Sequence, residues 1–247
     1  MMMQNAPRKS RKSSKRALAL IGGSEAIAQG AAIVRRLIIL RTIGVENYGI
    51  AVPMLLVLGL LNRVLEINPA STLIQDPRGS TRRFRDALQF VTLMRGVIVF
   101  TIILLLAVPL AVFNDLDTRE YVLAFMFIGI VPLIRGFCHI DVFRQLRRRQ
   151  YGTTAFMSTV SPVITTTIIA IMCLFMSSFW VPLIGKVIDS VTAVFMSFWV
   201  SKRSYRMRYD GPSTGRILKF SIPLIVGGII IFLAQQGPKQ LVSASDS

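Results

Sequence analysis

The chain has 247 residues, of which 53% are hydrophobic and only 17% are charged, and its mean hydropathy is +0.58. A soluble domain of this length needs more polar surface, so the composition excludes one and predicts an integral membrane protein. The net charge of +17 would also suit nucleic acid. However, the basic residues alternate with segments long enough to cross hydrocarbon, so we expect anionic membrane lipids as partners and no nucleic acid.

Seven apolar segments follow one another along the chain, and a helix needs about 20 apolar residues to cross a bilayer. We therefore predict an all-α, polytopic transmembrane helix bundle of about seven spans. The segments are Leu18–Leu40, Tyr48–Ile67, Phe90–Phe113, Tyr121–Ile140, Thr153–Phe179, Trp180–Val200 and Ile217–Gln235. The boundary between the fifth and sixth segments is marked only by Ser177 and Ser178.

These segments divide the chain into three parts. Residues 1–16 form a basic cytoplasmic N-terminal tail, and residues 17–200 form a six-span lobe. Residues 201–247 hold a basic cytoplasmic loop, the seventh span and a short outer tail.

Most of the positive charge lies in four clusters, which hold 20 of the 29 Lys and Arg residues. One cluster opens the chain between Arg8 and Arg16, and the other three lie around Arg82, Arg147 and Arg206. Short basic connections stay on the cytoplasmic side of a membrane. An N-terminus in the cytoplasm places all four clusters there, so we predict a multi-pass protein in that orientation.

Motifs for enzyme chemistry are missing from the sequence. It has no Gly-rich phosphate loop, no HExxH spacing and a single histidine, His139, while Cys138 and Cys173 lack CxxC spacing. We therefore expect no enzyme activity, no catalytic residue, no metal and no cofactor.

Charged side chains inside the apolar segments are functional candidates, because they cost several kcal/mol in lipid unless they face protein or water. Arg63, Glu66 and Arg95 lie near the cytoplasmic ends of their spans, where snorkelling to the headgroups is the favoured interpretation. The remaining charged residues are the candidates for lining a substrate cavity. They are Glu25, Arg35, Arg36, Arg135, Lys186 and Asp189.

All of these candidates except Glu25 have a structural alternative. Lys186 and Asp189 have the spacing of an ion pair on one helix face. Arg135 can either snorkel or line a cavity, and Arg35 and Arg36 can be interfacial. If Glu25, Arg35 and Arg36 line a cavity, Glu25 supplies an acid low in that cavity. Arg35 and Arg36 then supply cations higher up, which suit a phosphate-bearing ligand.

Short motifs along the whole chain resemble the polysaccharide and oligosaccharide flippases of the multidrug/oligosaccharidyl-lipid/polysaccharide exporter superfamily. The first is Arg41 to Gly49, which is similar to the connection after the first span in that family. Further similar segments are Leu73–Gln75, Leu93–Gly96, Pro109–Ala111, Lys219–Leu224 and Gln235–Gly237.

The resemblance implies a bacterial inner-membrane protein that flips a polyprenyl-pyrophosphate-linked oligosaccharide for cell-surface polysaccharide synthesis, with a glycan polymerase or export machinery as a further partner. Relatives resemble two helical lobes around a cavity, whereas this chain is equivalent to the N-terminal lobe plus one helix. We therefore expect a truncated member; pairing with itself or with a second lobe is the alternative.

Two other functions stay open. A cation-coupled multidrug exporter of the same superfamily needs an acid deep in the lobe, which Glu25 could supply. A non-transporting scaffold of a polysaccharide synthesis complex needs the spans but no cavity.

Overall fold

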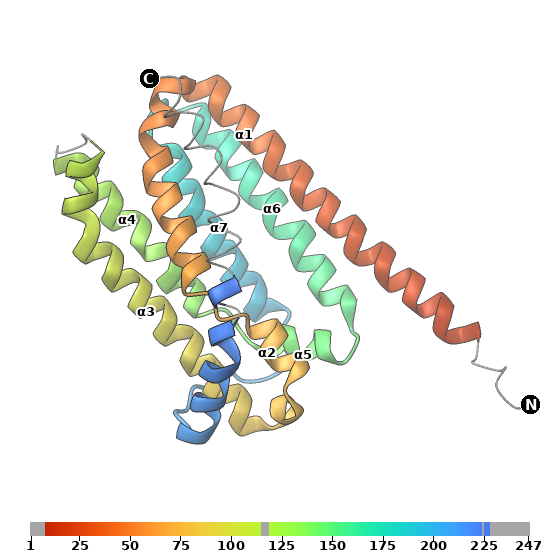
Figure 1. Cartoon of the computed structure of the whole chain (residues 1–247). Helices are drawn as coiled ribbons and strands as arrows, with labels where there is room; N and C mark the ends of the chain where they lie inside the picture. Colours follow the sequence, from red (N-terminus) through yellow and green to blue (C-terminus); the bar gives the residue numbers. More distant parts are fainter. Residues whose placement is uncertain (1–7, 115–118, 224, 228–247) are drawn as a thin grey trace, which may run out of the picture.

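The computed structural model describes residues 8–114, 119–223 and 225–227, and every regular element in those ranges is helical (Figure 1). This confirms the all-α bundle. The elements are α1 (Arg8–Val64), α2 (Pro69–Gln75), the 3-10 turn η1 (Pro77–Ser80), α3 (Arg82–Phe113), α4 (Arg119–Gly136), α5 (Asp141–Arg147), α6 (Tyr151–Cys173) and α7 (Trp180–Trp199). A further helix covers residues 211–223.

Helix α1 consists of two arms joined at a single residue. Gly44 has φ 79° and ψ 164°, which ends the first arm (residues 8–43) and starts the second (residues 45–64). Glycine is suited to this position because a side chain disfavours positive φ. Figure 1 shows the chain reversing at the top of the view, with the second arm diverging from the first, so the two arms correspond to the first two predicted spans.

The number of membrane crossings follows from the length and composition of the helices. Helices α1, α3, α6 and α7 are each long and apolar enough to cross a membrane, and α4 with α5 forms a fifth candidate bent by 53°. Because Gly44 divides α1 into two arms, counting each arm separately raises the number of candidate crossings from five to six. The predicted seventh span, Ile217–Gln235, is described through residue 223 and at 225–227, and its remainder lies outside the described residues.

Small residues allow the close packing of α3 on α4, which is among the most extensive contacts of the bundle together with that of α1 on α6. A Cβ on Gly96 would lie 2.6 Å from the carbonyl oxygen of Pro132, and a Cβ on Gly136 would lie 3.1 Å from Leu93 Cα. The backbones of α3 and α4 therefore approach each other closely at these glycines, as is common between helices in lipid.

The second, third and fourth basic clusters lie at one end of the bundle, with η1, α5 and the segment after α7 (Figure 1). Two of these arginines connect separate segments at this end of the bundle. Arg147 donates hydrogen bonds to the carbonyl oxygens of Leu73 and Asp76, and Arg216 forms an ion pair of 3.0 Å with Asp76. The opposite end carries Gly44 and the break between α6 and α7.

Candidate functional site

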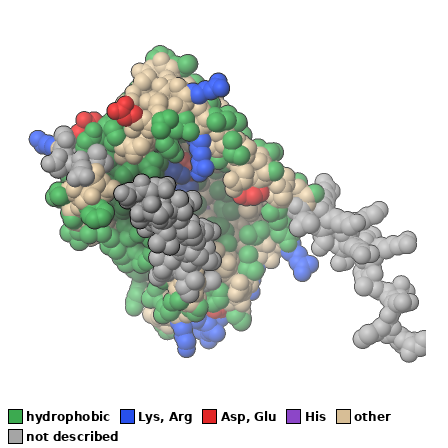
Figure 2. All heavy atoms as spheres, turned by 45° about the horizontal axis from the view of Figure 1, so that its top comes forward, with side chains coloured by type: hydrophobic (Ala, Val, Ile, Leu, Met, Phe, Trp, Pro, Cys, Tyr) green, Lys and Arg blue, Asp and Glu red, His purple; other side chains and the backbone are tan. Residues whose placement is uncertain are grey.

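Two adjoining hollows lie among the two arms of α1, α4 and α7. One of about 320 Å³ is lined by Arg35 and Arg36, and the other, of about 470 Å³, by Arg135 and Asp189. Lys186 lines both. We call the two hollows together the membrane cavity. Figure 2 shows Lys or Arg side chains set into a recess between hydrophobic flanks.

Two charged residues of this cavity, Arg35 and Asp189, lie at a similar depth in the bundle. Arg35 precedes the Gly44 turn by nine residues, and Asp189 follows the start of α7 at Trp180 by nine residues. At about 1.5 Å of rise per residue, both lie about 14 Å from the same end of the bundle, about half of a 30 Å hydrocarbon core. Arg35 therefore lies well inside the bundle rather than at its end.

Asp189 joins three helices. Its carboxylate lies 2.8 Å from the guanidinium of Arg135 on α4 and 3.7 Å from that of Arg35 on the first arm of α1. Its side chain is 17% exposed, that of Arg35 is 18% exposed and that of Arg135 is 53% exposed. Ser190 completes the contact, because its hydroxyl accepts a hydrogen bond from Arg135 Nε at 3.4 Å.

Lys186 and Asp189, for which an ion pair was the structural alternative, form no such pair in the part of the chain that the structure describes. The ion pairs of Asp189 are with Arg35 and Arg135. These two guanidinium groups approach from neighbouring helices and occupy both carboxylate oxygens. The side chain of Lys186 is exposed within the cavity instead.

Arg95 stabilises the floor of the cavity. Its guanidinium donates to the carbonyl oxygens of Leu65 and Asn62 and to the Asn62 side chain at 3.0 Å. These carbonyls belong to the end of the second arm of α1, where a cation is favourable. Snorkelling was the sequence-based interpretation for Arg95, but the structure turns its side chain inward against α1.

Positive charge exceeds negative charge in the membrane cavity. Six basic side chains line it, against two acidic ones: Arg35, Arg36, Arg63, Arg95, Arg135 and Lys186, against Glu66 and Asp189. Glu66 faces Arg63 at 3.4 Å. Among the described residues, Arg36 and Lys186 form no ion pair. A polyanion in the cavity would offset this excess, and guanidinium groups bind phosphate oxygens through two parallel hydrogen bonds.

Glu25 lies away from this cavity. Its side chain is exposed on the first arm of α1 and accepts a hydrogen bond of 3.2 Å from Gln29. It precedes Arg35 by ten residues, which is about 15 Å along a helix. The other five predicted site residues, namely Arg35, Arg36, Arg135, Lys186 and Asp189, meet at the cavity.

Sequence analysis missed the contributions of Arg63, Glu66 and Arg95 to the cavity lining. A residue near the end of a span can either snorkel to the headgroups or turn inward to line a cavity. Its position along the span therefore does not tell which of the two it does.

A family model described as "Polysaccharide biosynthesis protein" matches residues 38–245. The match includes Arg95, Arg135, Lys186 and Asp189, and it begins just after Arg35 and Arg36. Searches among curated proteins and among solved structures gave no match.

Proposed function

Because the chain belongs to the polysaccharide biosynthesis protein family, we propose that its role in polysaccharide biosynthesis is to flip a polyprenyl-pyrophosphate-linked oligosaccharide across the membrane. The observation that carries this proposal is the cationic cavity among apolar helices that are long enough to cross a membrane. A lipid-linked glycan has a hydrophobic tail that stays in lipid and a pyrophosphate that must cross. A cationic cavity lowers the cost of moving that anion through hydrocarbon.

The cavity residues divide into two groups in this mechanism. Asp189 holds Arg35 and Arg135 in place across three helices. Arg36 and Lys186, which have no ion-pair partner among the described residues, bind the pyrophosphate. The cavity forms one wall of the translocation pathway, and access alternates when packed helices rock around it.

The proposed orientation follows the basic clusters. The end of the bundle that carries α5 and η1 faces the cytoplasm of a bacterial inner membrane, because short basic connections are retained there. The lipid-linked oligosaccharide then enters from the basic end and leaves near the Gly44 end. Anionic lipids and a glycan polymerase or export machinery are the partners that this orientation suits.

A cation-coupled drug exporter is less well supported. That function needs a free acid within the cavity, and Glu25 lies outside it. Asp189 is already engaged by two arginines. An excess of cations would also repel a lipophilic cation.

The test is transfer of a fluorescent polyprenyl-pyrophosphate glycan in proteoliposomes, measured with a membrane-impermeant quencher. Arg36→Gln combined with Lys186→Gln should reduce the transfer rate by about tenfold or more, because two charge-assisted contacts to the pyrophosphate are lost. The matched control is Arg148→Gln with Arg149→Gln, which removes two exposed charges outside the cavity.

Equal rates for the two double variants would contradict the cavity as the route. Absence of transfer by the unmodified chain, together with its stable binding to a glycan polymerase, would favour the scaffold function instead.

A further inference from the structure

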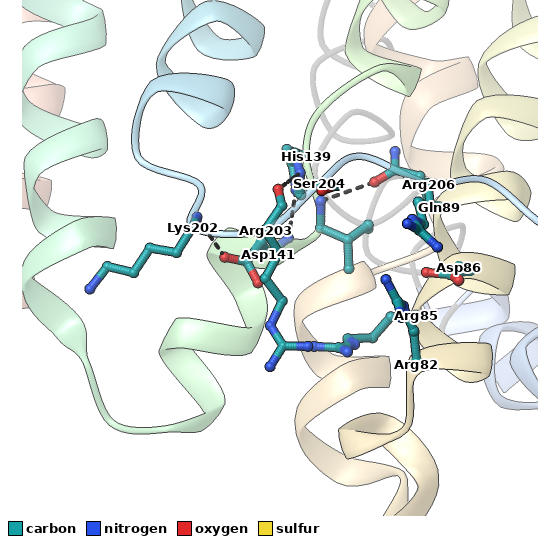
Figure 3. Close-up of a pocket in the computed structure, with 11 residues that line it drawn as sticks. Arg82, Arg85, Asp86, Gln89, His139, Asp141, Lys202, Arg203, Ser204 and Arg206 are labelled. Atoms are coloured by element: carbon teal, nitrogen blue, oxygen red, sulfur yellow. Dashed lines mark hydrogen bonds between the residues drawn. The ribbon is translucent and has the colours of Figure 1, made fainter.

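A second basic pocket lies at the end of the bundle that carries the basic clusters (Figure 3). It has a volume of about 330 Å³ and shares no lining residue with the membrane cavity. The first turns of α3, the bend between α4 and α5 and the segment after α7 form its walls. We call it the basal pocket. Its charged lining residues are Arg82, Arg85, Asp86, Asp141, Lys202, Arg203 and Arg206.

The walls of the basal pocket are fixed by a buried glutamine. Gln89 donates to the carbonyl oxygen of Cys138 at 3.0 Å and accepts from the backbone N–H of Ile140 at 3.0 Å. It also donates to the Tyr205 hydroxyl at 3.3 Å. Burial raises the pKa of this phenol, so Tyr205 stays neutral. One side chain therefore ties α3 to the bend and to the segment after α7.

His139 fixes the same segment from the other side. Its Nδ1 accepts a hydrogen bond from the backbone N–H of Asp141 at 3.1 Å. The other nitrogen, Nε2, then carries the proton and donates it to the carbonyl oxygen of Arg203 at 3.0 Å. The backbone N–H of Lys202 donates to Asp141 at 3.0 Å. The backbone that carries Lys202 and Arg203 is therefore held in place before any ligand arrives.

The negative charge of Asp141 is largely neutralised by contacts within the protein. Its carboxylate is buried, and it accepts hydrogen bonds from the guanidinium of Arg144 and from the Lys202 backbone. Asp86 is the other acid on the pocket wall, against five basic side chains. The pocket is therefore strongly cationic.

Like charges gather at the basal pocket. Arg85 lies near the positive charges of Arg203 and Arg144 as well as the negative charges of Asp141 and Asp86. Arg82 lies three residues before Arg85, so both project from one face of α3. Among the described residues, Arg82, Arg85, Arg203 and Arg206 form no ion pair. Such an arrangement is stabilised when an anion binds among the guanidinium groups.

We propose that the basal pocket is a second anion site that binds a phosphate group, carried by a phospholipid headgroup or free in solution. Guanidinium groups from two walls converge on one hollow and match the oxygens of a phosphate. The fixed backbone keeps the cost of ordering low when the ligand binds. The site is independent of the membrane cavity and of the translocated glycan.

The test uses the purified full chain in a neutral detergent and measures binding by isothermal titration calorimetry. Inorganic phosphate and dioctanoyl phosphatidylglycerol are the two probes, and dioctanoyl phosphatidylcholine is the zwitterionic reference lipid. Arg85→Gln with Arg203→Gln should weaken binding of the anionic probe by about tenfold or more. The control, Arg83→Gln with Arg148→Gln, removes two charges of the same end that do not line the pocket.

A third variant separates the two sites. Arg36→Gln with Lys186→Gln removes the anion contacts proposed for the membrane cavity. In this background, adding Arg85→Gln with Arg203→Gln should still weaken binding of the anionic probe, because the remaining binding belongs to the basal pocket. Binding of phosphatidylglycerol alone supports a headgroup ligand, and binding of phosphate as well supports a site that needs only the anion.

Two results would overturn the inference: no binding of either anionic probe, or equal weakening in the Arg85/Arg203 pair and the Arg83/Arg148 pair. A melting temperature for the pocket variant close to that of the unmodified chain excludes misfolding as the cause of weaker binding. If that variant unfolds, Arg82→Gln with Arg206→Gln removes two other pocket charges. Unweakened binding in this folded pair would likewise overturn the inference.

Discussion

Replacing Asp189 by asparagine tests whether this residue holds the cavity wall together. The substitution keeps the size of the side chain and removes the charge that faces Arg135 at 2.8 Å and Arg35 at 3.7 Å. A hydrogen bond to a charged group contributes about 1.5–3 kcal/mol. Arg135 is 53% exposed, so solvent screening reduces the contribution of its ion pair with Asp189 to stability. We expect a loss of about 2 kcal/mol in the free energy of unfolding.

The assay is thermal unfolding of the purified chain in detergent. For a protein of this size, about 2 kcal/mol corresponds to a decrease of about 4–8 °C in melting temperature. Glu25→Gln is the matched control, because Glu25 is exposed and accepts only the hydrogen bond of Gln29 among the described contacts. Its expected effect is within about 0.5 kcal/mol.

A double variant tests the contact between Asp189 and Arg135 directly. Asp189→Asn with Arg135→Gln removes both partners, so its loss should be smaller than the sum of the two single losses. Melting temperatures for Asp189→Asn and Glu25→Gln that agree within error would refute the role of Asp189 as the link between α1, α4 and α7.

Two further substitutions test the packing of the bundle and the walls of the basal pocket. Gly96→Ala places a Cβ 2.6 Å from the Pro132 carbonyl oxygen and should cost about 1–3 kcal/mol in unfolding free energy. Gly49→Ala, which meets nothing within 4 Å, should cost nothing, and a similar loss for both would contradict the close contact of α3 and α4. Gln89→Leu leaves the Ile140 N–H and the Cys138 carbonyl unpaired and should cost about 2 kcal/mol. An unchanged denaturant midpoint for that variant would show that these groups find other partners.

Apolar length was enough to predict the all-α bundle, because lipid leaves the backbone no alternative to helices. Ser177 and Ser178 correctly marked the division between α6 and α7, which lies at residues 174–179. The reversal at Gly44 lies between the first two predicted spans, Leu18–Leu40 and Tyr48–Ile67, as expected. That the helix continues up to this one residue on both sides was not predicted, and only its backbone angles show it.

The partners within the cavity could not be predicted from local spacing. Lys186 and Asp189 have the spacing of an ion pair, yet Asp189 binds Arg35, which lies 154 residues earlier in the chain. Such pairs depend on how three helices pack. The sequence does predict that charges at this depth must face the protein interior, which is why five of the six candidates meet at one cavity.

The basal pocket was missed for a different reason. The positive-inside pattern explains Arg85 and Arg203 by topology alone, so each was assigned to a basic connection. Only the hydrogen bonds of Gln89 and His139 show that these connections meet around one hollow.

The central claim is that the membrane cavity receives the pyrophosphate of a lipid-linked glycan. A single cysteine at Leu55, which lines both hollows, can be labelled with a water-soluble maleimide after Cys138 and Cys173 are replaced by alanine. Polyprenyl pyrophosphate should slow this labelling, whereas the corresponding polyprenol should not. Equal protection by both lipids, or by neither, would contradict the claim.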